Sequence, residues 1–241
     1  MHPRPQSRNQ SRKARAVPRV IAFDIYGTVI DPAGIVAHLE KAFGAQAKEA
    51  ARLWREKQIE FSFWRALMHK YENFDVCISQ ALTYVSERMH VHLSDNSKRV
   101  LLDAYLRLPA FPDVKTAFES LRDAGYTLVA LTNGVEKSVR ALLHHAELMP
   151  YFEAIITADK IETFKPNPAV YEQLVTSIRR PKEKIWLVSS NPWDVIGAKA
   201  YGLKSAWLQR DRARIFDPWE YSPDVIVASL EKLCDELPQL E

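Results

Sequence analysis

The sequence has no long apolar run. A helix that crosses a membrane needs roughly 20 consecutive apolar residues, and no stretch of the 241-residue chain approaches that length. The first apolar run, VIAF at residues 20–23, is ended at once by Asp24. We therefore expect a protein that works in solution, without a membrane partner.

Cysteine is scarce as well, and histidines with metal-binding spacing are missing. The two cysteines, Cys77 and Cys234, lie in separate apolar-patterned stretches without CxxC spacing. We interpret them as buried thiols of a reducing compartment, which favours a cytoplasmic protein. The pair His144 and His145 lacks HExxH spacing, so side-chain packing is its expected role.

Acidic residues are missing from the first 19 residues, which carry six cations. The rest of the chain has 27 basic and 30 acidic residues, a net charge of −3, so the formal charge of +3 arises from this tail. Residues 1–18 are polar and lack apolar periodicity, which predicts a disordered basic extension. An organellar transit peptide is the alternative. Because the excess of basic residues is confined to the tail, we expect no nucleic-acid partner.

The sequence does contain a repeated alternation of strands and helices. Short apolar runs rich in β-branched residues, which predict buried strands, cover residues 19–24, 126–133, 154–158, 184–190, 205–208 and 224–228. Helical patterns cover residues 113–124, 135–146, 167–178, 192–201 and 229–237. This alternation is typical of right-handed βαβ units. We therefore predict the α/β class, with a doubly wound parallel sheet.

One long segment interrupts this alternation. From about residue 33 to 108 the sequence shows only amphipathic helical patterns, and Pro109 and Pro112 then break the helix. We predict a helical domain of residues 33–109, inserted into an α/β core domain of residues 19–32 and 110–241.

Polar side chains gather where the predicted strands end. They are Asp24, Thr28, Thr132, Asn133, Lys165, Ser189, Ser190, Asn191 and Asp194. Ligands of doubly wound sheets bind beyond the carboxyl ends of the strands. The sequence therefore predicts that these side chains converge on one crevice beneath the helical domain.

Several of these motifs resemble those of the haloacid dehalogenase superfamily over residues 19–235. They are D-x-x-x-T-hydrophobic from Asp24 to Val29, LTNG at 131–134, KPNPAVYE at 165–172, and the acid-bearing turn SSNPWD at 189–194. Within the superfamily, the chain is more similar to the L-2-haloacid dehalogenases than to the phosphatases. The phosphatases place a second Asp where Tyr26 stands and a carboxylate-rich Gly-Asp turn where SSNPWD stands. The segment LWREKQIEFSFWRALM at 53–68 resembles the dehalogenase cap segment that supplies a halide-binding arginine.

The resemblance implies a Rossmann-type core with an inserted helical cap, and a metal-free hydrolysis. Asp24 would attack C2 of an (S)-2-haloacid, expel halide and form an ester. Water would then hydrolyse the ester to the (R)-2-hydroxy acid, without a metal or organic cofactor. A phosphoryl group brings about two negative charges to an aspartate, which discourages attack without a divalent cation. A magnesium-dependent phosphatase or phosphonate hydrolase, or a catalytically silent binding protein of this fold, are the alternatives.

The resemblance also assigns the catalytic groups. Thr28 would hydrogen-bond Asp24, and Lys165 would be its cation. Asp194 and Ser189 would hold Lys165 or the hydrolytic water, two roles that the sequence does not separate. Tyr171 belongs to the same set, with core packing as its alternative.

The remaining assignments concern the substrate. Arg55 and Asn191 would bind the halide, with Arg65 as the rival arginine, while Phe74 and Trp193 would exclude water. The substrate carboxylate would be held by the Thr132 hydroxyl and the backbone N–H groups of Ile25 and Tyr26, close to Asn133. The chain has Thr132 where the family has serine and Glu56 where it has glutamine. The aromatic residues Trp54, Phe61, Phe63 and Trp64 are predicted to form the core of the helical domain. The resemblance further implies a homodimer.

Overall fold

A computed structural model of the chain describes residues 19–237 and contains one six-stranded sheet. Its strands are β1 (Val20–Phe23), β2 (Thr127–Thr132), β3 (Ala154–Thr157), β4 (Ile185–Ser189), β5 (Lys204–Leu208) and β6 (Val225–Val227). Their spatial order is β3-β2-β1-β4-β5-β6, and every pairing is parallel. The predicted strands and the parallel, doubly wound topology are confirmed.

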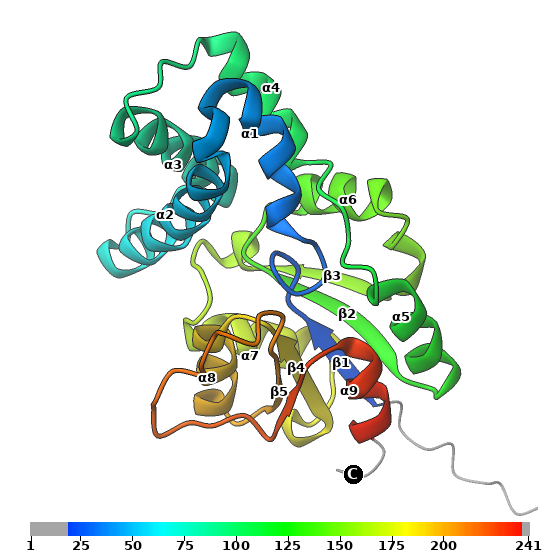
Figure 1. Ribbon diagram of the computed structural model, residues 1–241. Coiled ribbons are helices and arrows are strands. Elements are labelled where there is room, and N and C mark those ends of the chain that lie inside the picture. Colours follow the sequence, from blue (N-terminus) through cyan, green and yellow to red (C-terminus); the bar gives the residue numbers. More distant parts are fainter. Residues whose placement is uncertain (1–18, 238–241) are drawn as a thin grey trace, which may run out of the picture.

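Two layers of helices enclose the sheet (Figure 1). The helices that pack on the sheet are α5 (Val114–Asp123), α6 (Glu136–His145), α7 (Pro168–Ile178), α8 (Pro192–Tyr201) and α9 (Leu230–Glu236). Ile21 and Phe23 of β1 share a core with residues of α5, α6 and α9. Val20 and Ala22 share a second core with residues of α7 and α8. Because both faces are buried, the strands read as near-continuous apolar runs.

A helical insert (residues 33–109) lies between β1 and β2 in the sequence. Its helices are α1 (Val36–Phe43), α2 (Ala47–Met68), α3 (Phe74–Arg88) and α4 (Asp95–Tyr105). Short 3₁₀ segments complete the described chain: Pro32–Ile35, Gly44–Gln46, Met149–Tyr151, Ala158–Ile161 and Lys182–Lys184. The buried residues of α2 recur every three or four positions, at Ala47, Ala50, Trp54, Gln58 and Ser62. This period places them on one face of the helix.

The two chain crossings that join the insert to the sheet run side by side. The Asp31 N–H donates to the Pro109 carbonyl at 2.8 Å, and the Phe111 N–H donates to the Val29 carbonyl at 3.0 Å. The fit is tight at Gly34, where a Cβ would lie 2.4 Å from Cδ of Pro109. These bonds fix how the insert leaves and rejoins the sheet.

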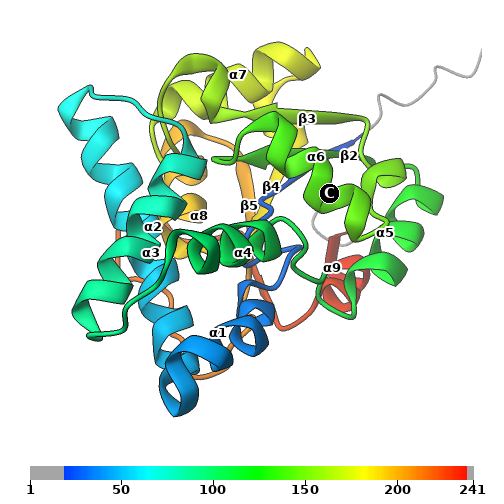
Figure 2. The same ribbon diagram turned by 90° about the horizontal axis from the view of Figure 1, so that it is seen from above.

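The helical insert covers the carboxyl ends of the strands, as seen from above in Figure 2. Two side-chain hydrogen bonds hold it there. Tyr71 Oη donates to Asp159 Oδ1 at 2.5 Å, and Ser138 Oγ donates to Asp75 Oδ2 at 2.6 Å. Among the described helices, none is long and apolar enough to cross a membrane. The predicted basic tail, residues 1–18, lies outside the described residues.

Candidate active site

The site is centred on Asp24, the residue that directly follows β1. Because β1 lies between β2 and β4, the polar residues after both neighbouring strands meet beside it. Asp24 Oδ2 accepts hydrogen bonds from Thr28 Oγ1 at 2.9 Å and from Asn191 Nδ2 at 2.8 Å. Ser189 Oγ lies 3.4 Å from the same oxygen. Asp24 is only 4% exposed, so its carboxylate is oriented by the protein rather than by bulk water.

Lys165 provides the positive charge that this buried carboxylate requires. Its side chain is completely buried, and Nζ donates to Asp24 Oδ1 at 2.8 Å, Asp194 Oδ2 at 2.6 Å and the Leu131 carbonyl at 3.0 Å. All three N–H groups of the ammonium are therefore used. Burial lowers the pKa of Lys165, but Asp194 and Asp24 outweigh it, so the net shift is upward and the side chain stays charged.

Asp194, at the start of α8, shares Lys165 with Asp24. Tyr171 Oη donates to Asp194 Oδ1 at 2.8 Å. Burial raises the pKa of Asp194, while Lys165 opposes the shift and Asp24 adds to it. A side chain at Gly197 would place its Cβ 2.6 Å from the Tyr171 hydroxyl, which explains glycine there. Of the two residues predicted to hold Lys165 or the hydrolytic water, Asp194 contacts Lys165, whereas Ser189 lies beside Asp24.

The turn after Asp24 presents two free backbone donors. The Ile25 carbonyl accepts from the N–H groups of Thr28, Val29 and Ile30, and Gly27 adopts a φ of 91° that favours glycine. Within residues 19–237, no hydrogen bond uses the N–H of Ile25 or Tyr26. The geometry of the turn thus leaves both groups available to an anion.

Ser190 holds this turn, a role that the sequence did not indicate. Its N–H donates to Thr28 Oγ1 at 2.8 Å, and its Oγ donates to the Gly27 carbonyl at 2.6 Å. Ser190 thereby links the loop after β4 to the turn after β1. Its position after the fourth predicted strand placed it at the crevice, but nothing in the sequence indicated which groups it would bind.

Arg55 reaches the site from α2. Its Nη2 donates to the Tyr26 carbonyl at 3.0 Å, and Asn191 Nδ2 lies 3.3 Å from the same oxygen. Arg65, the rival arginine, instead donates to the Lys70 carbonyl and to Gln80. The structure therefore brings Arg55, and not Arg65, to Asn191.

Two neighbours of Arg55 on α2 set its surroundings. Gln58 is completely buried, and its Oε1 accepts from Arg55 Nη1 at 3.3 Å and from the Tyr105 hydroxyl at 2.8 Å. Sequence reasoning missed Gln58, although its spacing of three residues from Arg55 places both on one helix face. Glu56 turns away from Arg55 and pairs with Arg52 at 2.5 Å, so it leaves the Arg55 charge uncompensated.

The Tyr26 ring forms an apolar wall between the insert and the sheet. Its centroid lies 5.8 Å from that of Tyr105 and 5.9 Å from that of Phe74. Its hydroxyl is buried and has no hydrogen-bond partner among the described residues. Burial raises the pKa of Tyr26 far above its ordinary value, so the phenol stays neutral.

Thr132 and Asn133 follow β2 on the other side of Asp24. The Thr132 hydroxyl accepts from the Gly134 N–H at 3.1 Å. Asn133 Oδ1 accepts from the Lys165 N–H at 2.8 Å, while its Nδ2 is buried without a partner in the described part of the chain. Asn133 therefore offers an unused donor next to Lys165.

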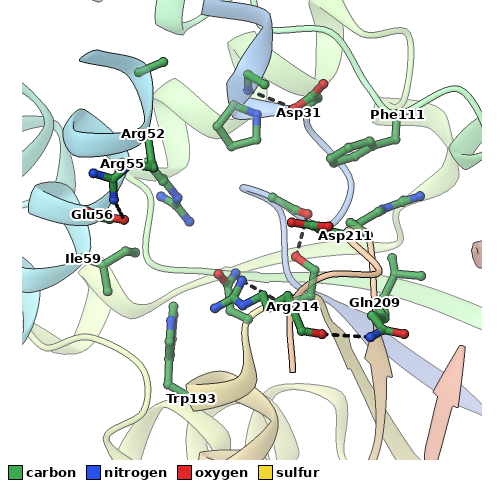
Figure 3. Close-up of a pocket in the computed structure, with 18 of the residues that line it drawn as sticks. Asp31, Arg52, Arg55, Glu56, Ile59, Phe111, Trp193, Gln209, Asp211 and Arg214 are labelled. Carbon is green, nitrogen blue, oxygen red and sulfur yellow. Dashed lines mark hydrogen bonds and ion pairs between the residues drawn. The ribbon is translucent and has the colours of Figure 1, made fainter. Parts of the chain in front are cut away.

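A cleft of about 1090 Å³ opens beside Arg55 and Asn191 (Figure 3). Its walls come from α2, from the turns after β1 and β4, and from the loop after β5. Trp193 lines it and packs edge-to-face against Phe63, with ring centroids 5.4 Å apart. The prediction that Phe63 and Trp64 lie in the insert core was wrong, because Phe63 lines the cleft and Trp64 is 50% exposed. Trp54 is buried as expected.

The predicted site residues lie close together, and Phe74 joins them by packing on the Tyr26 ring. Within the described residues, no group of three or more His, Cys, Asp or Glu side chains is placed to hold a metal ion. The acids of the site, Asp24 and Asp194, face one ammonium group between them. This arrangement provides a buried carboxylate that is paired with an ammonium group and lies next to unused donors.

Comparison with known proteins identifies relatives across most of the chain. A family model for haloacid dehalogenase-like hydrolases matches residues 18–202. The haloacetate dehalogenase H-2 of Moraxella sp. (strain B) is 36% identical over 213 residues, which are 88% of this chain and 95% of that protein. The (S)-2-haloacid dehalogenase of Pseudomonas sp. (strain YL) is 34% identical over 215 residues, 89% and 92% of the two chains.

The fold also matches solved structures closely. The L-2-haloacid dehalogenase from Xanthobacter autotrophicus, with chloropropionic acid covalently bound, superposes with a TM-score of 0.86. The two chains are 26% identical, and the match covers 93% of this chain and 100% of that one. The predicted fold class is therefore confirmed.

Proposed function

Because the chain belongs to the haloacid dehalogenase-like hydrolases, we propose that it hydrolyses (S)-2-haloacids to (R)-2-hydroxy acids through an ester on Asp24. The observation that carries this proposal is the environment of Asp24. Its carboxylate is buried, held by Thr28 and Asn191 and paired with Lys165. Tyr26 stands where a phosphatase would place its second acid.

In the first step, an Asp24 oxygen attacks C2 in line with the carbon–halogen bond. The new C–O bond forms as the C–X bond breaks, and the halide leaves with the electron pair. A developing anion needs donors that are placed in advance. Arg55 and Asn191, which meet at the Tyr26 carbonyl, provide them on the side of the cleft.

In the second step, water attacks the carboxyl carbon of the Asp24 ester and releases the 2-hydroxy acid and a proton. Only the first step touches C2, so the configuration is inverted. Asp194 and Tyr171 keep Lys165 beside Asp24, and Ser189, 3.4 Å from Asp24 Oδ2, is placed to hold the water.

The substrate carboxylate has a seat on the side of Asp24 next to β2. The groups that would hold it are the unused N–H groups of Ile25 and Tyr26, the Thr132 hydroxyl and the free Asn133 Nδ2. Tyr26 contributes its main chain to the seat and its ring to the wall. We assign the helical insert the role of a cap domain, residues 33–109, on a core domain of residues 19–32 and 110–241.

The test is halide release from each enantiomer of 2-chloropropionate and from chloroacetate, in EDTA, with Asp24→Asn as the control. Release from the S enantiomer, absent in the control, is expected. Chiral analysis of the lactate then checks the inversion. No halide release, with phosphate release from phosphoesters once magnesium is added, would overturn the proposal in favour of a phosphatase.

We also propose that the protein is a cytoplasmic homodimer. Both cysteines are free thiols, as a reducing compartment requires, and cell fractionation checks this.

The end of α2 exposes Trp64, Leu67 and Met68 by 50%, 79% and 58%, a cluster of the kind that subunit contacts bury. Light scattering should give twice the chain mass. Leu67→Glu should lower it, whereas Val100→Glu, at an isolated exposed position on α4, should not.

A further inference from the structure

The cleft beside Arg55 contains two arginines with no carboxylate partner. Of the other cleft arginines, Arg52 pairs with Glu49 and Glu56, and Arg210 forms a two-pronged pair with Asp113 at 2.7 Å. Among residues 19–237, no salt bridge includes Arg55 or Arg214. Asp31, Glu56, Glu60 and Asp211 also line the cleft, but in the described part of the chain none of them forms a salt bridge with either arginine. Two guanidinium groups that line one cavity without a salt bridge offer a place to an anion.

Arg214 belongs to the 209–214 loop, which follows β5. Figure 3 shows its side chain pointing into the cleft above Trp193, while Arg55 reaches in from α2. Arg214 Nη1 is 3.4 Å from the Ser190 carbonyl, a long contact. Desolvation lowers the pKa of Arg214; Asp217 and, more weakly, Asp211 oppose this shift, and repulsion from Arg55 adds to it, so the two guanidinium charges act on each other.

The 209–214 loop does not need the Arg214 guanidinium for its shape. Gln209 Nε2 donates to the Arg214 carbonyl at 2.8 Å, and Asp211 Oδ1 accepts from the Ala213 N–H at 2.9 Å. The Arg214 N–H donates to the Asp211 carbonyl at 3.1 Å. Backbone and neighbouring side chains thus hold the loop, which leaves the guanidinium free for another task.

The location of the pair suggests that task. The proposed reaction consumes one monovalent anion and releases a hydroxy acid anion and a halide. Asn191, Ser190 and Gly27 line the cleft, and Asn191 is bonded to Asp24. An anion that travels between solvent and Asp24 along this cleft therefore passes the two guanidinium groups.

We propose that Arg214 is the second arginine of an anion-binding site in the cleft, which it forms with Arg55 for small monovalent anions. The haloacid carboxylate meets this site on arrival, and the released halide meets it on departure. The inference rests on the proposed function for the identity of these anions. The site itself rests on the two unpaired guanidinium groups.

The binding test uses chloride and requires no turnover. The ³⁵Cl NMR line width is followed as wild type, Arg214→Gln and Arg212→Gln are added to a chloride solution, with bromide as competitor. Arg212 is a matched control, since it is in the same loop but does not line the cleft. Arg214→Gln should lose most of the bromide-sensitive broadening, whereas Arg212→Gln should retain it.

The kinetic test measures kcat/KM for (S)-2-chloropropionate at low and high ionic strength. Arg214→Gln should lower kcat/KM about tenfold at low salt and converge with wild type at high salt, with kcat preserved, because electrostatic steering is screened by salt. Weaker chloride binding alone assigns the site to the halide, and a lower kcat/KM alone assigns it to the carboxylate. Arg214→Gln that matches Arg212→Gln in both tests overturns the inference. If wild type releases no halide, the proposed function fails and the chloride titration still decides on the site.

Discussion

Tyr26 contributes to the site through its main chain and its ring, whereas its hydroxyl makes no hydrogen bond to the described residues. Its hydroxyl is buried without a partner among the described residues, and an unsatisfied buried group costs stability. Tyr26→Phe should therefore leave the free energy of unfolding unchanged or raise it by about 1 kcal/mol. Halide release should also persist, since the backbone N–H and the ring remain.

Urea unfolding and halide release check this prediction, with Tyr26→Asp as the contrasting variant. Aspartate would restore the acid of the phosphatases but would bury a second unpaired charge beside Asp75, so it should lower stability strongly. A loss of turnover in Tyr26→Phe would mean that the hydroxyl takes part in the chemistry.

Lys165 is the residue on which the buried charges of the site depend. Lys165→Met leaves Asp24 and Asp194 without their shared cation, so we expect a loss of about 3–5 kcal/mol in the free energy of unfolding and no turnover. Lys160→Met is the control, because Lys160 is 55% exposed in its pair with Glu136 and such pairs contribute at most about 1 kcal/mol.

A second variant separates stability from chemistry at Lys165. Lys165→Met with Asp194→Asn removes one of the two buried charges and should recover part of the lost stability, but no halide release. Urea unfolding with a halide assay measures both. Equal stability of Lys165→Met and Lys160→Met would show that the two acids tolerate each other without the ammonium.

At the residue scale, the sequence located groups that belong to linear motifs and missed those that act through space. Asp24, Lys165 and Asp194 each lie directly after or near a strand end, so the sheet brings them together. Ser190 binds Thr28 and Gly27, and Gln58 binds Tyr105, across the fold at sequence separations that no local pattern encodes. The choice between Arg55 and Arg65 likewise required the orientation of α2.

At the scale of elements, the sheet was predictable but the subdivision of the helical insert was not. The strands are buried on both faces and therefore give continuous apolar runs. In the insert, α2 ends at His69 with φ of 53°, and α3 is followed by His90 with φ of 55°. Glycine is the usual residue at such left-handed positions, so two helix ends lacked their common signal. Phe63 and Trp64 are neighbours in the sequence, but Phe63 lines the cleft and Trp64 is exposed. Predicting that difference requires the rotational orientation of α2, which the sequence pattern did not give.

Besides the bond of Arg55 to the Tyr26 carbonyl, two side-chain hydrogen bonds tie the helical insert to the core, Tyr71 to Asp159 and Ser138 to Asp75. Tyr71→Phe with Ser138→Ala removes both hydrogen bonds and should cost about 1–3 kcal/mol in the free energy of unfolding. Arg55 should then be placed less tightly over Asn191, so kcat/KM should fall while Asp24 remains intact. Thr83→Ala, at a position on α3 away from these ties, is the control.

Hydrogen exchange with halide assays checks this coupling of elements. Faster exchange at the Asp31 and Phe111 amides, which join the two chain crossings, should accompany the loss of kcat/KM. Unchanged exchange at those amides, together with wild-type turnover, would show that packing alone closes the insert on the sheet.

At the scale of the whole molecule, the sequence predicted where the site is but not what surrounds it. The parallel topology fixes the crevice at the carboxyl ends of the strands. The cleft depends on how the insert docks and on the 209–214 loop, which has no strand or helix pattern. Arg214 is therefore invisible to motif reasoning, although its charge faces Arg55 in the folded chain.

The stability of the molecule should also depend on alkaline pH through its buried acids. Burial raises the pKa of the Cys77 thiol from 9.0 to about 11. The unfolded chain therefore loses this proton first, so the contribution is present below about pH 9 and lost as pH rises towards 11. The loss amounts to roughly 2–3 kcal/mol. Above about pH 10, Tyr26, Tyr171 and Lys165, whose pKa values are also raised, extend the decline.

Urea unfolding of wild type and Cys77→Ala at pH 8, 9, 10 and 11 tests this dependence. The variant should be less stable at pH 8, because alanine leaves a small cavity in the insert core, but its stability should fall less between pH 9 and 11. Thr83→Ala, on the same helix, should shift the curve without changing its shape. If the free energy of unfolding falls equally with pH in wild type and Cys77→Ala, the Cys77 thiol does not contribute to the difference in bound protons between the folded and unfolded states. The alkaline loss would then be assigned to the tyrosines and Lys165 alone.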